Sequence, residues 1–167
     1  MKKKILYIDM DGVLADFEHA IKIIEPSLDC SDYENSKEKV YAICKANPYI
    51  FHTLKPIPGA LYCTKKLFQL YDVYFLSTPM WEVPLSFTGK REWIGEHFGA
   101  DAEKRLILTH RKDLAIGDIL VDDRLTNGAM FFTGKHIHFG TSEFPNWMAT
   151  YMYLRGALDY DQLKSNS

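Results

Sequence analysis

Aspartates follow two short apolar runs of the sequence. Asp9 and Asp11 come at the end of the first run, and Asp122 and Asp123 follow Ile-Leu-Val at residues 119–121. Carboxylate oxygens are hard ligands of the kind that Mg²⁺ prefers, and several of them repel one another unless a cation lies between them. A carboxylate can also attack phosphorus and divide one difficult displacement into two easier ones. These residue types therefore fit metal-assisted phosphoryl transfer.

Hydroxyls and an amine follow two further apolar runs. Ser77 and Thr78 come after Val-Tyr-Phe-Leu at residues 73–76, and Leu-Ile-Leu at residues 106–108 leads through Thr109 to Lys112. Such groups can neutralise and orient phosphoryl oxygens, where most of the stabilisation of the transition state arises. Gly12, directly after Asp11, would let the backbone approach a phosphate closely.

These chemical groups need a common edge, and the order of the elements supplies one. Apolar strand patterns alternate with helical patterns, which predicts βαβ units and an α/β fold. We expect a doubly wound, mainly parallel, five-stranded, Rossmann-like sheet with both faces covered. The predicted strands are residues 4–9, 73–76, 106–108, 119–121 and 137–139. Ligands of such sheets bind beyond the carboxyl ends of the strands, which is where the polar residues fall.

One region departs from this alternation. Residues 16–58 contain helical patterns but no strand pattern. We therefore expect an α/β core domain formed by residues 1–15 and 59–167, with residues 16–58 as a small helical cap inserted after the first strand. A cap in that place would cover the edge of the sheet.

The composition restricts the partners of the protein. The 167 residues are 47% hydrophobic and 25% charged, as in ordinary globular domains, and their net charge is −2. No basic excess is present for a nucleic-acid polymer, and no stretch has the length to span a membrane. Cys30, Cys44 and Cys63 show no paired metal or redox spacing, which is typical of reduced thiols. We expect a cytoplasmic protein that acts on a small molecule, and a homodimer is compatible with the sequence.

Several stretches resemble one family. Residues 9–18, Asp-Met-Asp-Gly-Val-Leu-Ala-Asp-Phe-Glu, resemble motif one of the haloacid dehalogenase superfamily of phosphatases, and more narrowly that of the 5′(3′)-deoxyribonucleotidases. Ser77, Lys112 and Asp122-Asp123 follow in the order of motifs two, three and four. Residues 54–60, Leu-Lys-Pro-Ile-Pro-Gly-Ala, and residues 120–124, Leu-Val-Asp-Asp-Arg, match as well.

The resemblance implies a reaction and a metal site. The expected reaction is the Mg²⁺-dependent hydrolysis of (deoxy)nucleoside monophosphates to nucleoside and phosphate through an aspartyl-phosphate. Asp9 would be the nucleophile, and Asp11 would protonate the leaving oxygen and then deprotonate the water. The implied Mg²⁺ ligands are Asp9, the backbone carbonyl of Asp11, Asp122 and Asp123.

The resemblance also implies how substrate is bound. Ser77, Thr78, Lys112 and Lys90 would bind the phosphate, whereas Phe17 and Phe51 would line the nucleoside pocket. Each assignment has a plainer alternative: Lys90 can be a solvated lysine, and the two phenylalanines can be core residues. His136 and His138 have the spacing of one strand face, which favours a half-buried strand over a metal pair.

Other functions stay open from the residues alone. The same chemistry could act on a sugar phosphate or another small phosphometabolite. A phosphoaspartate receiver module is a rival of another class, but receivers place the acidic pair and the phosphorylated aspartate in a different order and have no cap. A dehalogenase has no use for Asp11 as an acid–base group or for Asp122-Asp123.

Overall fold

A five-stranded parallel sheet forms the centre of the protein. The computed structural model describes residues 2–28 and 33–165. The strands are ordered β3-β2-β1-β4-β5, and every neighbouring pair is parallel. Their bounds are β1 Ile5–Ile8, β2 Asp72–Ser77, β3 Leu106–Leu108, β4 Ile119–Asp122 and β5 Lys135–His138. The predicted α/β class, the parallel sheet and its five strands are confirmed.

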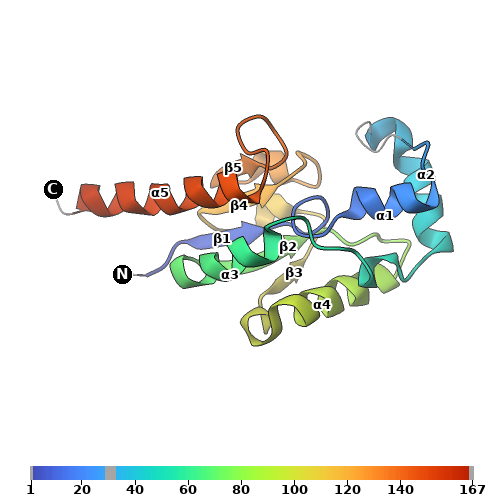
Figure 1. Cartoon of the computed structure of the whole chain (residues 1–167), viewed down its shortest axis with the longest axis horizontal. Helices are drawn as coiled ribbons and strands as arrows, with labels where there is room; N and C mark the ends of the chain where they lie inside the picture. The colour runs from blue at the N-terminus through green and yellow to red at the C-terminus, as the bar shows by residue number, and fades with distance from the viewer. Residues whose placement is uncertain (1, 29–32, 166–167) are drawn as a thin grey trace.

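Helices connect the strands and flank the sheet (Figure 1). The α-helices are α1 Phe17–Ile24, α2 Tyr33–Ala46, α3 Ala60–Leu70, α4 Leu85–Phe98 and α5 Trp147–Ser165. Short 3₁₀ helices are η1 Ile50–His52, η2 Gly99–Ala102, η3 Lys112–Leu114 and η4 Ala129–Phe131. Among the described residues, none of the helices combines the length and the apolar character that crossing a bilayer requires.

The two faces of the sheet are covered by different kinds of element. Alternate strand residues such as Ile8 and Phe75 pack in the main core with the buried residues of α3, α4 and α5. The opposite face carries Tyr7 and Leu120, which pack with Ala129 of η4 and neighbouring residues. Crossovers between parallel strands are right-handed, so the face that a connection covers depends on the direction in which the chain moves across the sheet. That direction reverses after β3, and the connections therefore change face. The sheet is thus doubly wound, with 3₁₀ turns where the second helical layer would lie.

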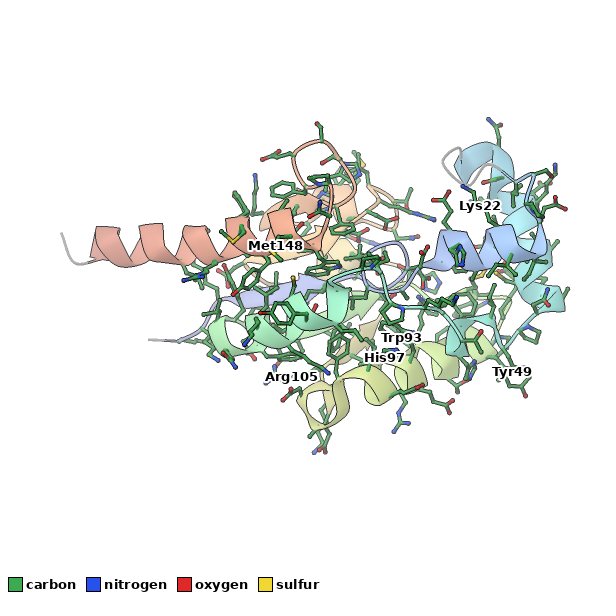
Figure 2. The ribbon with its side chains drawn as sticks, viewed as in Figure 1. Lys22, Tyr49, Trp93, His97, Arg105 and Met148 are labelled. Atoms are coloured by element: carbon green, nitrogen blue, oxygen red, sulfur yellow. The ribbon has the colours of Figure 1, made fainter. Side chains whose placement is uncertain are left out.

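Helix α4 begins earlier than its sequence suggests. Thr88 has the character of a helix cap, yet the helix starts at Leu85, directly after Pro84. Proline fits there because its fixed φ suits a first turn and its missing N–H has no intrahelical acceptor. Further along, the rings of Trp93 and His97 stack at 4.2 Å between centroids, one turn apart on this helix (Figure 2).

Helices α1 and α2 and the 3₁₀ helix η1 lie between β1 and α3 in the sequence. In Figure 1, α1 and α2 stand together beyond the carboxyl ends of the strands. The chain enters and leaves this region at one place, since Asp16 N donates to Lys55 O at 2.8 Å and Ile57 N donates to Leu14 O at 2.8 Å. Asp16 also caps α1 by accepting a hydrogen bond from His19 N at 3.1 Å.

The returning segment of this region is held against α4. Trp93 Nε1 donates to Leu54 O at 2.8 Å, and both groups are buried. Gly89 of α4 has no side chain to separate the two segments: a Cβ there would lie 2.8 Å from Phe51 Cβ and 2.8 Å from His52 Nδ1. Helix α4 is therefore the support on which η1 rests.

Candidate active site

A cavity of about 160 Å³ lies at the carboxyl ends of β1, β2 and β4. Its walls include Asp9, Asp11, Ser77, Lys112 and Asp122 from the sheet side. Parallel strands bring these groups together because their carboxyl ends share one edge. Residues of α1, α2 and η1 line the same cavity from the other side.

A tight loop after β1 fixes the first two aspartates. Met10 O accepts hydrogen bonds from the N–H groups of both Leu14 and Ala15 at 2.8 Å. Gly12 has φ +78, and a Cβ on it would lie 2.2 Å from Asp123 Oδ2. Only glycine meets both demands, the left-handed backbone and the close approach of a carboxylate from the loop after β4. Gly12 of motif one thus permits the close contact with Asp123 of motif four.

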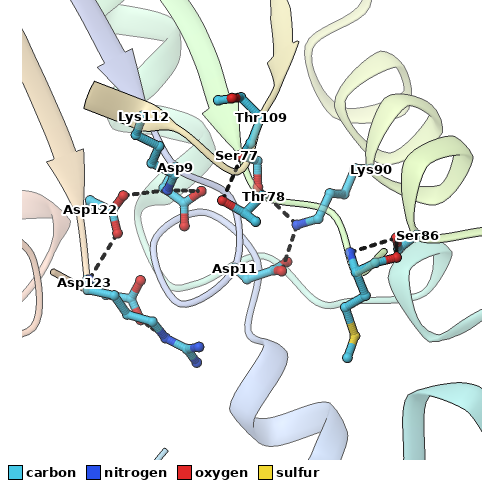
Figure 3. Close-up of polar contacts among 12 residues, drawn as sticks. Asp9, Asp11, Ser77, Thr78, Ser86, Lys90, Thr109, Lys112, Asp122 and Asp123 are labelled. Carbon is cyan, nitrogen blue, oxygen red and sulfur yellow. Dashed lines mark hydrogen bonds and ion pairs between the residues drawn. The ribbon is translucent and has the colours of Figure 1, made fainter. Parts of the chain in front are cut away.

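Three aspartates and one lysine form an ionic cluster on one side of the site (Figure 3). Lys112 Nζ lies 2.9 Å from Asp9 Oδ1 and also donates to Asp122 Oδ2. Asp9, Asp122 and Asp123 each offer an oxygen within 4.8 Å of the others. Lys112, Asp9 and Asp122 are all buried. One buried cation therefore faces three carboxylates.

The shortage of positive charge alters how these groups titrate. Burial, then the charge of Asp9, raises the pKa of Asp122 to about 6. Burial, then Asp9 and Asp122, raises the pKa of Asp123 to about 8. Burial alone would lower the pKa of Lys112, but Asp9 and Asp122 raise it above its ordinary value, so the lysine stays charged.

The cluster has the features of a divalent-cation site. Its donors are carboxylate oxygens, the type that Mg²⁺ prefers. Asp123 Oδ1 is buried and has no hydrogen-bond partner among the described residues. An added cation would supply that partner and relieve the repulsion that raises the two pKa values. The residues present therefore fit a bound Mg²⁺.

A second polar group lies on the other side of Asp9. Lys90 Nζ is 2.6 Å from Asp11 Oδ2 and 2.9 Å from Ser77 Oγ. Figure 3 draws both contacts as dashed lines. Lys90 comes from the interior of α4 and its exposed fraction is 0%. Within the described residues it is not among the side chains that line the cavity, whereas Asp11 and Ser77 are. The structure brings Lys90 to the site but places its amine behind the cavity wall.

The remaining predicted phosphate ligand is Thr78. It lines the cavity, and its hydroxyl donates to Thr109 O at 2.9 Å. This bond joins the segments that follow β2 and β3. Since the hydroxyl proton is engaged, the oxygen that Thr78 presents to the site is an acceptor in this arrangement.

Phe17 and Phe51 line the cavity together. Their rings stack with centroids 5.6 Å apart and planes 13° apart, and both residues are buried. Lys90 Nζ lies 5.5 Å from the centroid of the Phe51 ring. The two rings belong to the core and to the wall of the cavity at once, so their packing leaves the predicted pocket role open.

The cavity has lining residues that sequence reasoning missed. Lys37, Val40 and Tyr41 of α2 face it, and their spacing of three and four residues is that of one helix face. That spacing was a usable signal, although nothing in it pointed to a ligand. Other lining residues come from loops and had no signal: Pro79, Met80, His110, Arg124, Thr126 and Asn127.

The histidine pair on β5 is a structural neighbour of the aspartates. The rings of His136 and His138 stack at 5.7 Å between centroids, and His138 Nε2 is 2.9 Å from Asp123 O. Neither ring joins the candidate metal cluster found among the described residues, which consists of aspartates alone. Trp81 is 74% exposed and meets the edge of the His110 ring.

The cysteines stand apart from this chemistry. Cys44 and Cys63 are buried free thiols, and Cys30 lies outside the described residues. Burial, then the charge of Asp11, raises the pKa of Cys44 to about 12, so this thiol stays protonated.

Sequence comparisons point to one kind of enzyme. Residues 3–150 match the family model described as 5′ nucleotidase, deoxy (pyrimidine), cytosolic type C protein. A protein of Vibrio phage KVP40, provisionally named 5′(3′)-deoxyribonucleotidase, is 45% identical over 153 residues, covering 91% of this chain and 85% of the relative. The human cytosolic-type 5′(3′)-deoxyribonucleotidase is 30% identical over 149 residues, covering 71% of this chain and 70% of the relative.

Solved structures support the fold. A haloacid dehalogenase-like hydrolase from Xanthomonas campestris superposes with a TM-score of 0.58 at 11% identity, covering 93% of this chain and 96% of the other. A hydrolase of the same type from Bacillus subtilis, described as bound to magnesium, gives a TM-score of 0.56 at 12% identity, covering 92% and 99%. At these identities the likeness concerns the fold alone.

Proposed function

The chain belongs to the family of 5′ nucleotidase, deoxy (pyrimidine), cytosolic type C proteins, and on that premise we propose that it is a Mg²⁺-dependent phosphatase of deoxyribonucleoside monophosphates. The predicted resemblance to the haloacid dehalogenase superfamily, and to its deoxyribonucleotidases, is confirmed. One observation carries the proposal. Carboxylates, an amine and a hydroxyl from four separate segments of the chain converge on a single cavity.

Asp9 is proposed as the nucleophile. It lies directly after β1 on the cavity wall, and its Oδ1 is 2.9 Å from Lys112 Nζ. As Asp9 forms a bond to phosphorus, the bond between phosphorus and the ester oxygen breaks, which gives an aspartyl-phosphate and a free alcohol. Lys112 and the Ser77 hydroxyl are placed to neutralise charge on the phosphoryl oxygens.

Asp11 is proposed to move the protons. In the first step it donates a proton to the departing ester oxygen. In the second step it removes a proton from water, which attacks the aspartyl-phosphate and releases phosphate and free Asp9. Its position two residues after the nucleophile, on the same cavity wall, supports both roles.

A magnesium ion would be held by Asp9, Asp122 and Asp123, with the backbone carbonyl of Asp11 as a further ligand. When bound, it supplies positive charge that orients the phosphate and offsets the crowding of the carboxylates. Support comes from the three clustered oxygens and from the buried, unpartnered Asp123 Oδ1.

We propose residues 16–58 as a cap that selects the substrate. Phe17, Phe51 and the α2 face of Lys37, Val40 and Tyr41 line the cavity opposite the aspartates. An aromatic wall suits a planar base, and a lid of this kind excludes polymers while it admits a mononucleotide. A sugar phosphate would leave the aromatic wall unused.

The direct test is phosphate release from a deoxyribonucleoside monophosphate, measured with Mg²⁺, with excess EDTA, and with the Asp9→Asn variant. We expect turnover in the first condition and none in the other two. Ca²⁺ should support turnover poorly, because its larger and more flexible shell misplaces the nucleophile. Full activity in EDTA would remove the metal from the proposal, and a folded, active Asp9→Asn variant would remove the nucleophile.

A further inference from the structure

The contacts of Lys90 differ from those expected of a phosphate ligand. Its amine donates to Asp11 Oδ2 at 2.6 Å and to Ser77 Oγ at 2.9 Å. The side chain is fully buried, and among the described residues it does not line the cavity. Phosphate held against Asp9 would therefore meet Lys112 and Ser77, with Lys90 behind them.

We propose that Lys90 is a positioning residue that orients the proton-carrying carboxyl group of Asp11. This inference rests on the proposed function. Lys90 donates to Oδ2 of Asp11, whose side chain lines the cavity, and so fixes the rotation of the carboxyl group. The other oxygen, Oδ1, is buried and has no hydrogen-bond partner among the described residues.

The setting of Lys90 makes this orientation rigid. The amine is fixed by two hydrogen bonds and lies 5.5 Å from the Phe51 ring centroid, in surroundings where a charge-assisted bond is strong. The second hydrogen bond, to Ser77 Oγ, holds the amine itself in place. The fixed amine thus sets the direction of the acid–base group.

The two possible roles of Lys90 predict different kinetics. Loss of a phosphate ligand would weaken the binding of every phosphate substrate and of inorganic phosphate, which acts as an inhibitor. A residue that orients Asp11 acts on protonation of the leaving oxygen, which matters for an alkoxide leaving group such as a nucleoside and matters little for p-nitrophenolate. The value of kcat/KM reports this first step, because it covers events only as far as the first irreversible one.

The test uses Lys90→Met, which keeps the length of the side chain and removes its charge. We expect kcat/KM for a deoxyribonucleoside monophosphate to fall by at least about tenfold and by no more than the roughly 10²–10⁴-fold that a positioned acid or base contributes. The loss with p-nitrophenyl phosphate should be at least about tenfold smaller. The inhibition constant of inorganic phosphate should stay unchanged, whereas loss of a direct charged hydrogen bond would raise it by about tenfold or more.

Two further variants guard the interpretation. Arg91→Met, at the next position of α4, removes an exposed charge and should leave all three quantities unchanged. In the Asp11→Asn background, Lys90→Met should cause little additional loss, because a residue that acts through Asp11 has nothing left to orient. This double variant also removes both charges of the buried pair, so it can fold where the single lysine variant does not.

A rise in the inhibition constant of phosphate, or an equal loss with both substrates, would overturn the inference and make Lys90 a phosphate ligand. A further loss of the same size in the Asp11→Asn background would overturn it as well. If the wild-type enzyme hydrolyses no nucleotide, the proposed function fails by itself. The comparison then uses the best alkyl phosphate substrate, since the inference requires only a poor leaving group.

Discussion

Asp9 and Asp11 are two residues apart, yet their carboxylates have different partners. Asp9 pairs with Lys112 beside two further aspartates, whereas Asp11 pairs with Lys90 on the opposite side. Glycine at position 12 lets the loop that follows them approach Asp123 closely. The geometry thus puts the proposed nucleophile within the carboxylate cluster and the side chain of the proposed acid–base group away from it.

Separate roles for the two aspartates predict different failures. Asp9→Asn should abolish turnover. Asp11→Asn should still transfer phosphate to Asp9 from p-nitrophenyl phosphate, whose leaving group needs no acid, and then stall because no base activates water. Rapid mixing should show a burst of p-nitrophenol equal to the enzyme concentration with Asp11→Asn, and no burst when Asp9→Asn is added to it. A burst from Asp9→Asn would contradict the assignment.

The aspartate cluster should reduce the stability of the metal-free protein. Because the folded state raises the pKa of Asp123 to about 8, its carboxylate favours folding when protonated and opposes it as pH rises from the ordinary value of 3.8 towards 8. Asp123→Asn should therefore raise Tm in EDTA, by more near pH 8 than near pH 5. For a chain of this length, each 1 kcal/mol in the free energy of unfolding shifts Tm by about 2–4 °C.

Mg²⁺ provides the control for that measurement. It should raise the Tm of the wild type by binding the folded state, and it should do so much less for Asp123→Asn. If the variant is less stable than the wild type in EDTA at both pH values, the cluster carries no electrostatic cost and the argument for a cation there is weakened.

At the scale of elements, the contact between η1 and α4 holds the proposed cap, residues 16–58, to the rest of the fold. Gly89 permits it, and a methyl group there would lie 2.8 Å from Phe51 Cβ and 2.8 Å from His52 Nδ1. The same contact places Phe51 above Lys90. A change in packing at Gly89 should therefore affect both Phe51 in the aromatic wall and Lys90 beside Asp11.

Gly89→Ala should destabilise the protein by about 1–3 kcal/mol, the usual cost of overpacking a core, and should lower kcat/KM for nucleotides. Gly95→Ala on the same helix is the matched control, because nothing lies within 4 Å of its added Cβ. That change should stabilise by about 0.5–1 kcal/mol through helix propensity. Thermal unfolding of the two variants checks the contrast, and equal stability would contradict the packing argument.

The aromatic wall makes a prediction about substrate binding. Phe17→Ala or Phe51→Ala should raise KM for a nucleoside monophosphate and affect p-nitrophenyl phosphate less, since aromatic contacts contribute about 0.5–1.5 kcal/mol beyond area. Phe131→Ala, on the exposed side of η4, is the control. If both wall variants change all substrates alike, these phenylalanines serve packing alone.

The sequence predicted the strands and the residues at their ends because a buried parallel strand is a short apolar run, and its end is marked by the first polar residue. It could not predict that Lys90 pairs with Asp11, 79 residues away, since only the packing of α4 brings them together. It also missed the thin second face, because η3 and η4 are too short to show helical periodicity.

For the molecule as a whole, the two faces of the sheet are covered unequally, with a larger core on one face and a smaller one on the other. Helices α3, α4 and α5 pack against the larger core, and α4 also carries Lys90 and supports η1. The lysine beside Asp11 and the support of Phe51 thus both come from the thickly covered side of the fold. The opposite face contributes Lys112 through η3, which is tied to the sheet by its buried ion pairs.

The central claim, a phosphatase that recognises the base of a nucleotide, is tested most directly by one ratio. It compares kcat/KM for a deoxyribonucleoside 5′-monophosphate with kcat/KM for 2-deoxyribose 5-phosphate in the presence of Mg²⁺. The two substrates share the phosphate and the sugar and differ by the base. We predict a ratio of at least severalfold in favour of the nucleotide, which is the value that about 1 kcal/mol of aromatic contact would give. A ratio of one or less would contradict the nucleotidase account and make the protein a phosphatase of sugar phosphates.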